Sequence, residues 1–214
     1  MTSPSMNVFL DDKPLTAQPT FAAALRTAVD EAARSGRVVV EATLDGDAIA
    51  DGVLENPPEE ALGTELRLVS VEPKVLVRAT LLDAADALET VVRDQRKSAE
   101  FIHQGKVEEA MPPLSAAIQT WQVVRETVEK GAALVQVPLD SVKFRGGASG
   151  ADRLLDLIAT LTTGLEEVKR SLAAEDWSGL ADVLAYDMCE QAEKWGGTLR
   201  SLSASLEPEG EPGV

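Results

Sequence analysis

Two residues have the spacing of a metal-binding motif. Glu100 and His103 lie three residues apart in a helical stretch, the Glu-x-x-His arrangement that carboxylate-bridged di-iron bundles use on two helices. His103 is the only histidine of the chain, so a second motif of this kind cannot form. We therefore expect no metal site. We expect His103 to lie at the end of its helix, where a cation is favoured.

The other residues that could do chemistry favour structural roles. A thiolate–imidazole pair would need the single cysteine, Cys189, to meet the single histidine, and a cysteine buried in a helical core is much commoner than a nucleophile there. The glycine-rich run 146–150 does not match a phosphate-binding loop and follows no predicted strand. Carboxylate pairs such as Glu190 and Glu193 are typical of solvated helix faces. We predict no catalytic residue, no cofactor and no enzymatic activity.

The charge of the chain restricts its partners. Its 214 residues include 36 acidic and 20 basic ones, which gives a net charge of −16. Residues 1–72 carry 13 acidic and 5 basic residues and the remainder carries 23 and 15, so each part has a net charge of −8. Because a phosphate backbone or an anionic membrane surface would repel such a chain, we expect neither nucleic acid nor membrane as a partner. Basic or apolar protein partners remain open.

Cysteine content and hydropathy predict the compartment. One cysteine allows no internal disulfide, which suits a reducing environment. The apolar run 7–10 is too short for the core of a secretion signal, and no apolar run approaches the length of a transmembrane helix. We therefore expect a cytoplasmic protein.

Residues 6–72 predict a small α+β domain. The order is strand, short strand, helix, strand, short strand and strand. The expected elements are strands at 8–10 and 13–15, a helix at 21–34, a strand at 37–44 followed by an Asp45-Gly46 turn, a return strand at 48–49 and a last strand at 66–71. This order resembles the β-grasp, the ubiquitin-like fold, and a split αβ sandwich would have a similar pattern. Because the module ends internally and not in an exposed diglycine, a docking or dimerisation role is favoured over a conjugated modifier.

The pattern of residues 73–206 predicts four long amphipathic helices, because apolar residues recur every three or four positions. The expected helices span residues 74–104, 106–134, 151–174 and 176–206. Residues 136–150 form a long loop between two hairpins, 74–134 and 151–206, and the acidic tail 207–214 is expected to be disordered. Short turns between such helices predict an antiparallel four-helix bundle. The fold class is therefore α+β, with the β-grasp-like domain first and the bundle second.

Two details of the bundle remain open. Pro112 and Pro113 interrupt the second helix, so either a helix starts at Pro112 after a short turn or a longer helix is sharply kinked there. The two hairpins also align at a shift of 70 residues, which places Leu114 on Leu184 and Ile118 on Met188. This alignment indicates one helical hairpin used twice, although any two amphipathic helices align tolerably at some shift.

Aromatic residues supply the candidate partner-binding positions. Trp121 and Trp195 are expected in the core of the bundle. Trp177 at the start of the last helix and Tyr186 are candidate anchors for a partner, together with Phe144 and Arg145 at the tip of the long loop. Gly196-Gly197 interrupts the last apolar stripe, and because glycine costs about 1 kcal/mol in a helix interior, it predicts a close helix approach or a local bend.

Two segments of the helical half resemble a known family. Residues 99–124 and 170–195, and best of all the run 104–110 (QGKVEEA), are similar to the helix pairs of flagellin-type export chaperones. The resemblance implies an apolar groove for a partner's helix. The whole chain also resembles two-part bacterial proteins of no established function.

These observations together predict a non-enzymatic interaction protein. Its role would be that of an adaptor, chaperone or assembly factor that binds a protein partner through the bundle. The alternatives are an enzyme or small-ligand binder with a pocket between the two domains, and a structural homodimer.

Overall fold

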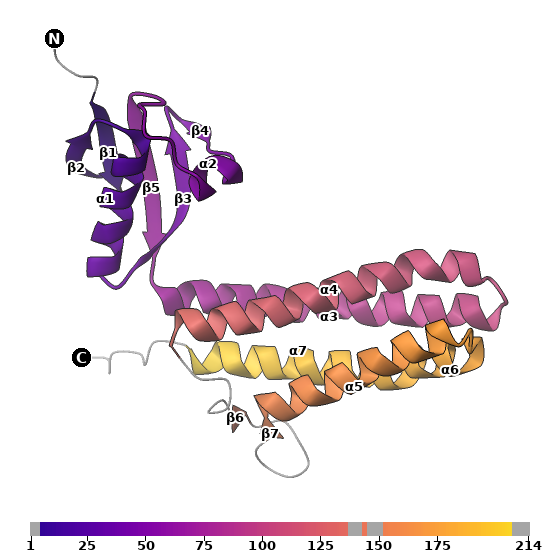
Figure 1. Ribbon diagram of the computed structural model, residues 1–214. Coiled ribbons are helices and arrows are strands. Elements are labelled where there is room, and N and C mark those ends of the chain that lie inside the picture. Colours follow the sequence, from indigo (N-terminus) through magenta and orange to yellow (C-terminus); the bar gives the residue numbers. More distant parts are fainter. Residues whose placement is uncertain (1–4, 137–142, 145–151, 207–214) are drawn as a thin grey trace. The chain divides into compact units, whose positions relative to one another are not determined.

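The computed structural model describes residues 5–136, 143–144 and 152–206 (Figure 1). The chain separates into two compact units, Met1–Leu76 and Val77–Val214. A five-stranded sheet lies in the first unit and the second is mostly helical, so the predicted α+β class is confirmed. The predictions made for Arg145 and for the tail 207–214 lie outside the described residues.

The first unit has the strand order of a β-grasp. Its elements are β1 (Met6–Leu10), β2 (Lys13–Gln18), α1 (Phe21–Arg34), β3 (Val38–Leu44), β4 (Asp47–Ala48), α2 (Asp51–Glu55) and β5 (Glu65–Val71). The sheet order is β2-β1-β5-β3-β4, with β1 parallel to β5 and all other neighbours antiparallel. The short helix α2 was not predicted, because five residues are too few for a periodic pattern.

Helix α1 covers one face of this sheet with small residues. Thr20 caps the helix by accepting a hydrogen bond from the Ala23 N–H at 3.2 Å. The buried residues of the resulting core come from one face of α1 and from alternate positions of β1 and β5: Met6, Val8, Leu10, Phe21, Ala24, Ala28, Ala32, Leu66 and Leu68. Alternation in the strands and a helical stripe in α1 were the sequence signals for this arrangement.

Two aspartates at hairpin turns hold both ends of β5. Asp11 and Asp45 have left-handed backbones, with φ of 50° and 51°, as two-residue hairpins require. Asp11 accepts hydrogen bonds from the N–H and the hydroxyl of Ser70, both at 2.7 Å. Asp45 accepts from the Thr64 hydroxyl at 2.7 Å and the Glu65 N–H at 2.8 Å. These bonds lower the pKa of both carboxyl groups, through the Ser70 hydroxyl for Asp11 and the Thr64 hydroxyl for Asp45.

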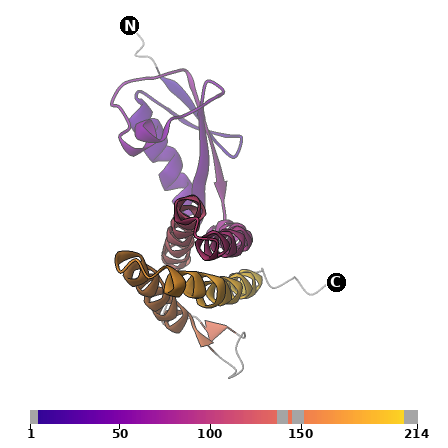
Figure 2. The same ribbon diagram turned by 90° about the vertical axis from the view of Figure 1, so that its right-hand side faces the viewer.

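The second unit consists of long helices with one irregular turn. Its elements are α3 (Pro73–His103, which begins before the unit boundary), α4 (Val107–Leu134), β6 (Lys143–Phe144), β7 (Asp152–Arg153), α5 (Leu154–Ala173), α6 (Trp177–Asp182), the π-helical segment η2 (Val183–Asp187) and α7 (Met188–Ser205). Figure 2 looks along the helices, with the α3–α4 hairpin (magenta to red) on one side and the α5–α7 arm (orange to yellow) on the other.

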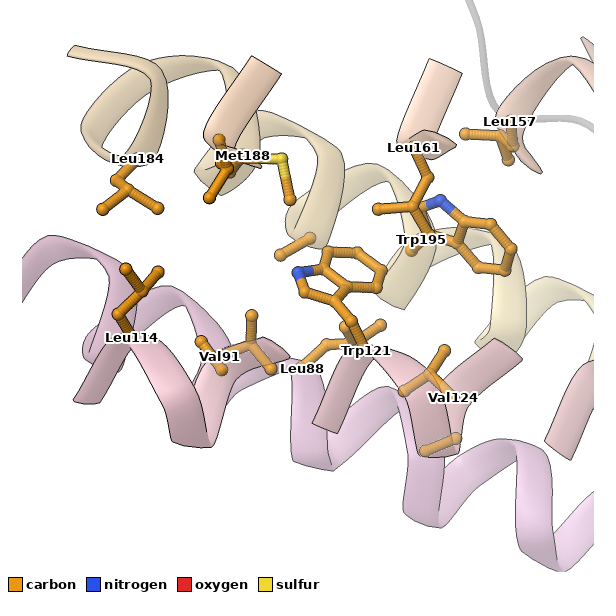
Figure 3. Packing of buried hydrophobic residues seen from close by; sticks show 14 of the residues in the cluster. Leu88, Val91, Leu114, Trp121, Val124, Leu157, Leu161, Leu184, Met188 and Trp195 are labelled. Atoms are coloured by element: carbon orange, nitrogen blue, oxygen red, sulfur yellow. The ribbon is translucent and has the colours of Figure 1, made fainter. Parts of the chain in front are cut away.

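The core of this unit forms where the two hairpins meet. Trp121 and Trp195 are both buried, as predicted, and pack edge to face with ring centroids 6.1 Å apart (Figure 3). Gln95 is buried beside them. With its amide oriented to suit its neighbours, its oxygen accepts from Trp121 Nε1 at 3.0 Å and its nitrogen donates to the Met188 carbonyl at 3.2 Å. This amide therefore links three helices inside an otherwise apolar core.

Helix α4 begins at Val107 and passes through both prolines. The alternative in which a helix starts at Pro112 after a short turn is therefore wrong. Proline lacks an N–H, so Pro112 and Pro113 leave the carbonyls of Glu108 and Glu109 without their usual helical donors. Both glutamates are exposed and lie in the first turn of the helix, where water can hydrate these carbonyls. The cost of the proline pair is therefore smaller here than it would be in the middle of the helix.

The pattern of residues 176–206 predicted a single α-helix. The structure instead has a π-helical segment, η2, between α6 and α7. In the π-helical segment, the Met188 N–H bonds to the Val183 carbonyl, one residue further back than in an α-helix. The Leu184 carbonyl instead accepts a hydrogen bond from Cys189 Sγ at 3.2 Å. A wider turn of this kind accommodates one extra residue without ending the helix.

This extra residue corrects the predicted repeat. The buried residues Leu114 and Ala117 of α4 are three positions apart, whereas Leu184 and Met188 in the last helix are four apart. The shift between the hairpins is therefore 70 residues up to Leu184 and 71 residues from Met188 onward. Met188 corresponds to Ala117, and the predicted equivalence with Ile118 is wrong.

The turns between the helices of each hairpin have the same geometry. Gly105 ends α3 with φ of 73° and Glu175 follows α5 with φ of 52°, and these positions are 70 residues apart. In each turn, the N–H of the next residue donates to the carbonyl five positions earlier. Lys106 donates to Phe101 at 2.8 Å, and Asp176 donates to Ser171 at 2.9 Å. Both are Schellman-type helix ends. The left-handed position favours glycine, which only the first turn has.

Candidate protein-binding surface

The interface between α3 and α7 is closed by polar contacts at its outer edge. Its ion pairs join Arg96 to Glu193 at 3.2 Å, and Arg200 to Asp86 and Glu89 at 2.9 and 2.8 Å. The Ser203 hydroxyl donates to the Arg78 carbonyl at 3.3 Å. Gly196 is buried, and a Cβ at this position would lie 3.8 Å from the Ala85 carbonyl oxygen. Such a Cβ would be in van der Waals contact with the α3 backbone, which favours a close approach over a local bend as the reason for this glycine. Gly197 has no neighbour within 4 Å of such a Cβ.

The interface between α4 and α5 has an apolar outer edge. Met111 and Ile118 of α4 lie seven residues apart, and so do Ile158, Leu165 and Leu172 of α5. All five are partly buried and pack against the core. They form a third apolar row on each helix, beside the two rows that already fill the core. A third row is common on helices that pack into a bundle, so the row alone does not mark a binding site.

A cleft opens between these two helices, and we refer to it as the α4/α5 cleft. It encloses about 240 Å³. Its lining consists of an apolar floor and a charged rim, namely Ile158, Leu161, Leu165, Thr162, Arg125, Glu166 and Lys169. Arg125 comes from α4 and all the others from α5.

Two cations and one carboxylate form the rim of the α4/α5 cleft. Arg125 Nε lies 3.7 Å from Glu129 Oε1, one turn along the same helix, and both side chains are largely exposed. In the described part of the chain, neither Lys169 nor Glu166 takes part in an ion pair. The cleft can therefore contact an apolar ligand with its floor and a charged one with its rim.

The predicted partner-binding residues do not line this cleft. Trp177 is half-buried and packs against the helical core. Tyr186 lies on the π-helical segment with 70% of its surface exposed, so it remains available to a partner. Phe144 belongs to β6, where it pairs with Asp152, and Arg145 is outside the described residues. Trp177 and Tyr186 therefore differ in exposure, and neither of them lines the cleft.

The residues that could do chemistry have structural surroundings. His103 ends α3, and its Nε2 lies 4.0 Å from Asp182 Oδ1. Cys189 is buried, and this burial raises the pKa of its thiol above the usual value. Among the described residues, no cluster of three or more histidine, cysteine, aspartate or glutamate side chains could hold a metal ion.

A second cleft, of about 370 Å³, lies on the sheet of the first unit. It is lined by Asp11, Asp12, Glu41, Thr43, Arg67, Leu68 and Val69. Most of its charged groups bind each other or the backbone. Arg67 Nη1 lies 3.0 Å from Asp12 Oδ1, and Arg67 Cζ lies 4.6 Å from the centroid of the Phe9 ring. Asp11 accepts a hydrogen bond from the Ser70 hydroxyl. This cleft therefore presents fewer unsatisfied groups than the α4/α5 cleft.

A sequence signal for the α4/α5 cleft exists. The periodic pattern of α5 counts Ile158 and Leu165 as inward-facing residues together with Leu154, Leu161 and Val168. The stripe is therefore wider than two rows. A stripe of this width would also suit a helix that other helices surround on three sides. The sequence alone therefore does not show that part of the stripe stays exposed.

Comparison with known proteins gives one result. The model of a family described as a domain of unknown function (DUF8042) matches residues 79–198, which is more than half of the chain. The matched segment runs from α3 into α7 and includes both walls of the α4/α5 cleft. Neither the curated proteins nor the solved structures gave a match. Among the described residues, no helix is long and apolar enough to cross a bilayer.

Proposed function

The chain belongs to the DUF8042 family, a domain of unknown function, and we propose that it is a non-enzymatic protein-interaction module. In this role it binds a protein partner through its helical bundle, as an adaptor, chaperone or assembly factor. The observation that supports this proposal is the α4/α5 cleft with its apolar floor. The single cysteine suits the reducing cytoplasm, which we propose as its compartment.

The physical argument rests on the hydrophobic effect. Apolar surface removed from water is worth about 25 cal/mol per Å², so covering the floor of the cleft favours binding. Ile158 and Leu165 of α5 are only partly buried by the core and belong to the floor of the cleft. A partner that fills the cleft would bury the exposed parts of these side chains.

Affinity capture from a native lysate tests this proposal with one variant and one matched control. Leu165→Arg places a charge on the floor of the α4/α5 cleft. Leu155→Arg makes the same change ten residues earlier in α5, at a residue that is 42% exposed and does not line the cleft. We expect the wild type and the Leu155 variant to retain one stoichiometric protein, and the Leu165 variant to lose it.

Thermal melts by circular dichroism show whether both variants are folded. If the Leu165 variant retains the same protein, the partner binds elsewhere on the bundle or on the first unit. A metal or cofactor that copurifies with the wild type in stoichiometric amount, with no protein retained, would contradict the proposed function.

A further inference from the structure

The rim of the α4/α5 cleft indicates the chemistry of its partner. We propose that the partner inserts one amphipathic helix, whose apolar face meets the floor of the cleft and whose flanks carry carboxylates. This inference rests on the proposed function and adds the type of segment and its charge.

The spacing of the apolar residues fits a helical ligand. Ile158 and Leu165 of the floor lie seven residues apart, and Leu172 continues this series along α5 beyond the cleft. Fourteen residues of α5 extend over about 21 Å at 1.5 Å per residue. A partner helix with apolar residues at heptad spacing would meet this series in register, as a further helix of a bundle does.

The charges on the two walls favour a partner with carboxylates. Arg125 stands on α4 and Lys169 on α5, so a helix in the cleft would have one cation along each flank. At the α3/α7 interface, Arg96 and Arg200 are paired with acidic residues of the neighbouring helix. Across the α4/α5 interface no such pair forms among the described residues. A carboxylate of a partner helix would pair with Lys169, and a second one would compete with Glu129 for Arg125.

Glu166 opposes this preference and gives the inference an internal check. It lies on the rim between the apolar floor and Lys169, three residues before Lys169 on α5. A carboxylate on the partner is repelled by Glu166 while Lys169 attracts it. Removing the charge of Glu166 should therefore strengthen the binding of an acidic helix.

A second copy of this chain is a weaker candidate for the occupant. Each copy has a net charge of −16, so charge repulsion opposes a second copy more strongly than it opposes one helix with a few carboxylates. The rim of a second copy also brings the same excess of cations over carboxylates. A separate acidic helix meets a complementary rim without this second set of cations.

Two synthetic peptides serve as probes for the full-length chain. Both are about three heptads long with leucine on one face, and they differ only in carrying glutamate or lysine along the flanks of that face. Binding is measured by fluorescence anisotropy at 0.15 M salt, where the screening length of about 8 Å suppresses charges far from the cleft. We expect the glutamate peptide to bind about tenfold more tightly than the lysine peptide, since two exposed ion pairs contribute roughly 0.2–1 kcal/mol each and the lysine peptide meets repulsion instead.

Paired charge reversals identify the residues that are responsible. Arg125→Glu combined with Lys169→Glu should invert the preference, so that the lysine peptide binds more tightly. The control combines Lys130→Glu with Arg170→Glu, which makes the same change of charge on the same two helices. Lys130 and Arg170 do not line the cleft, and each pairs within its own helix. This control should retain the preference for the glutamate peptide. Glu166→Gln should tighten the binding of that peptide about twofold.

Three outcomes would overturn the inference. If both peptides bind equally well and compete with the natural partner, the cleft selects apolar surface alone, and the proposed function stands without its charge preference. If neither peptide binds while lysate capture still depends on Leu165, the partner is not a helix of this kind. If the wild type sediments as a dimer that Leu165→Arg dissociates, a second copy occupies the cleft.

Discussion

The interfaces α3/α7 and α4/α5 are built differently, although both join antiparallel helices of the same bundle. The outer edge of α3/α7 carries ion pairs from Arg96 and Arg200 and a close backbone approach at Gly196. The outer edge of α4/α5 carries partly buried apolar side chains and a cleft of about 240 Å³. One edge is satisfied by the chain itself, whereas the other is left with surface and charges that a partner could satisfy.

This difference separates stability from binding within one bundle. The ion pairs and the glycine contact across α3/α7 hold the two hairpins together. Apolar residues at the edge of α4/α5 contribute less burial than core residues do, and their exposed parts remain available to a partner. Equivalent substitutions at the two interfaces should therefore have different consequences.

The largest effect is expected when a glycine at the α3/α7 interface is replaced by leucine. Gly196→Leu should destabilise the protein by about 2 kcal/mol, because the added side chain must enter a region where α3 and α7 already touch. Gly197→Leu is the matched control. Nothing lies within 4 Å of its Cβ position, so it should stabilise the helix by up to about 1 kcal/mol. Urea denaturation of both variants measures the difference, and equal effects would mean that the helices are not in close contact at Gly196.

A smaller effect is expected when one arginine is removed from each interface. Arg200→Ala should cost about 1 kcal/mol, because Arg200 pairs with both Asp86 and Glu89 on the neighbouring helix. Arg125→Ala at α4/α5 should cost no more than about 0.3 kcal/mol, since its ion pair is a long one within its own helix. Both values come from urea denaturation at 0.15 M salt. A larger loss of stability for Arg125→Ala would show that this residue supports the fold and is not available to a partner.

Much of the fold was predictable from local patterns. The strands of the first unit follow from β-branched runs bounded by turn residues, such as the Asp45-Gly46 hairpin that leads into β4. The long helices follow from stripes that end at a glycine or an aspartate cap, and Asp176 does accept from the Gly179 N–H. These signals depend on a few neighbouring residues, which a single sequence contains in full.

The remaining features depend on how distant segments pack. The π-helical segment is visible only when the core positions of α4 and the last helix are compared, because a step of four residues is as compatible with an α-helix as a step of three. The path of α4 through Pro112 depends on the exposure of the preceding carbonyls. The α4/α5 cleft depends on which helices become neighbours. Periodicity identifies an apolar face but does not say how much of that face the rest of the chain covers.

The buried thiol at the closed interface should make stability depend on alkaline pH. Burial raises the pKa of Cys189 in the folded state, so the folded protein holds this proton more firmly than the unfolded chain does. The stabilisation is complete below the unfolded pKa of about 8.5 and is lost as the pH rises through the folded value. Between pH 7 and pH 9.5, the wild type should lose more stability than Cys189→Ala, by less than about 1 kcal/mol. Parallel pH profiles of the two proteins would contradict this.

The smallest effect on stability is expected when a threonine at the α4/α5 interface is replaced by leucine. Thr162 lines the α4/α5 cleft, and its hydroxyl donates to the Ile158 carbonyl of its own helix at 2.9 Å. Thr162→Leu removes this local bond but improves helix propensity, and the cleft has room for the larger side chain. The change in unfolding free energy should stay within about 0.5 kcal/mol. The same variant should weaken capture of the partner, because leucine fills space that the partner would occupy. A stable variant that no longer binds would separate the role of this interface from that of α3/α7, whereas a variant that loses about 2 kcal/mol, like Gly196→Leu, would show that both interfaces are closed.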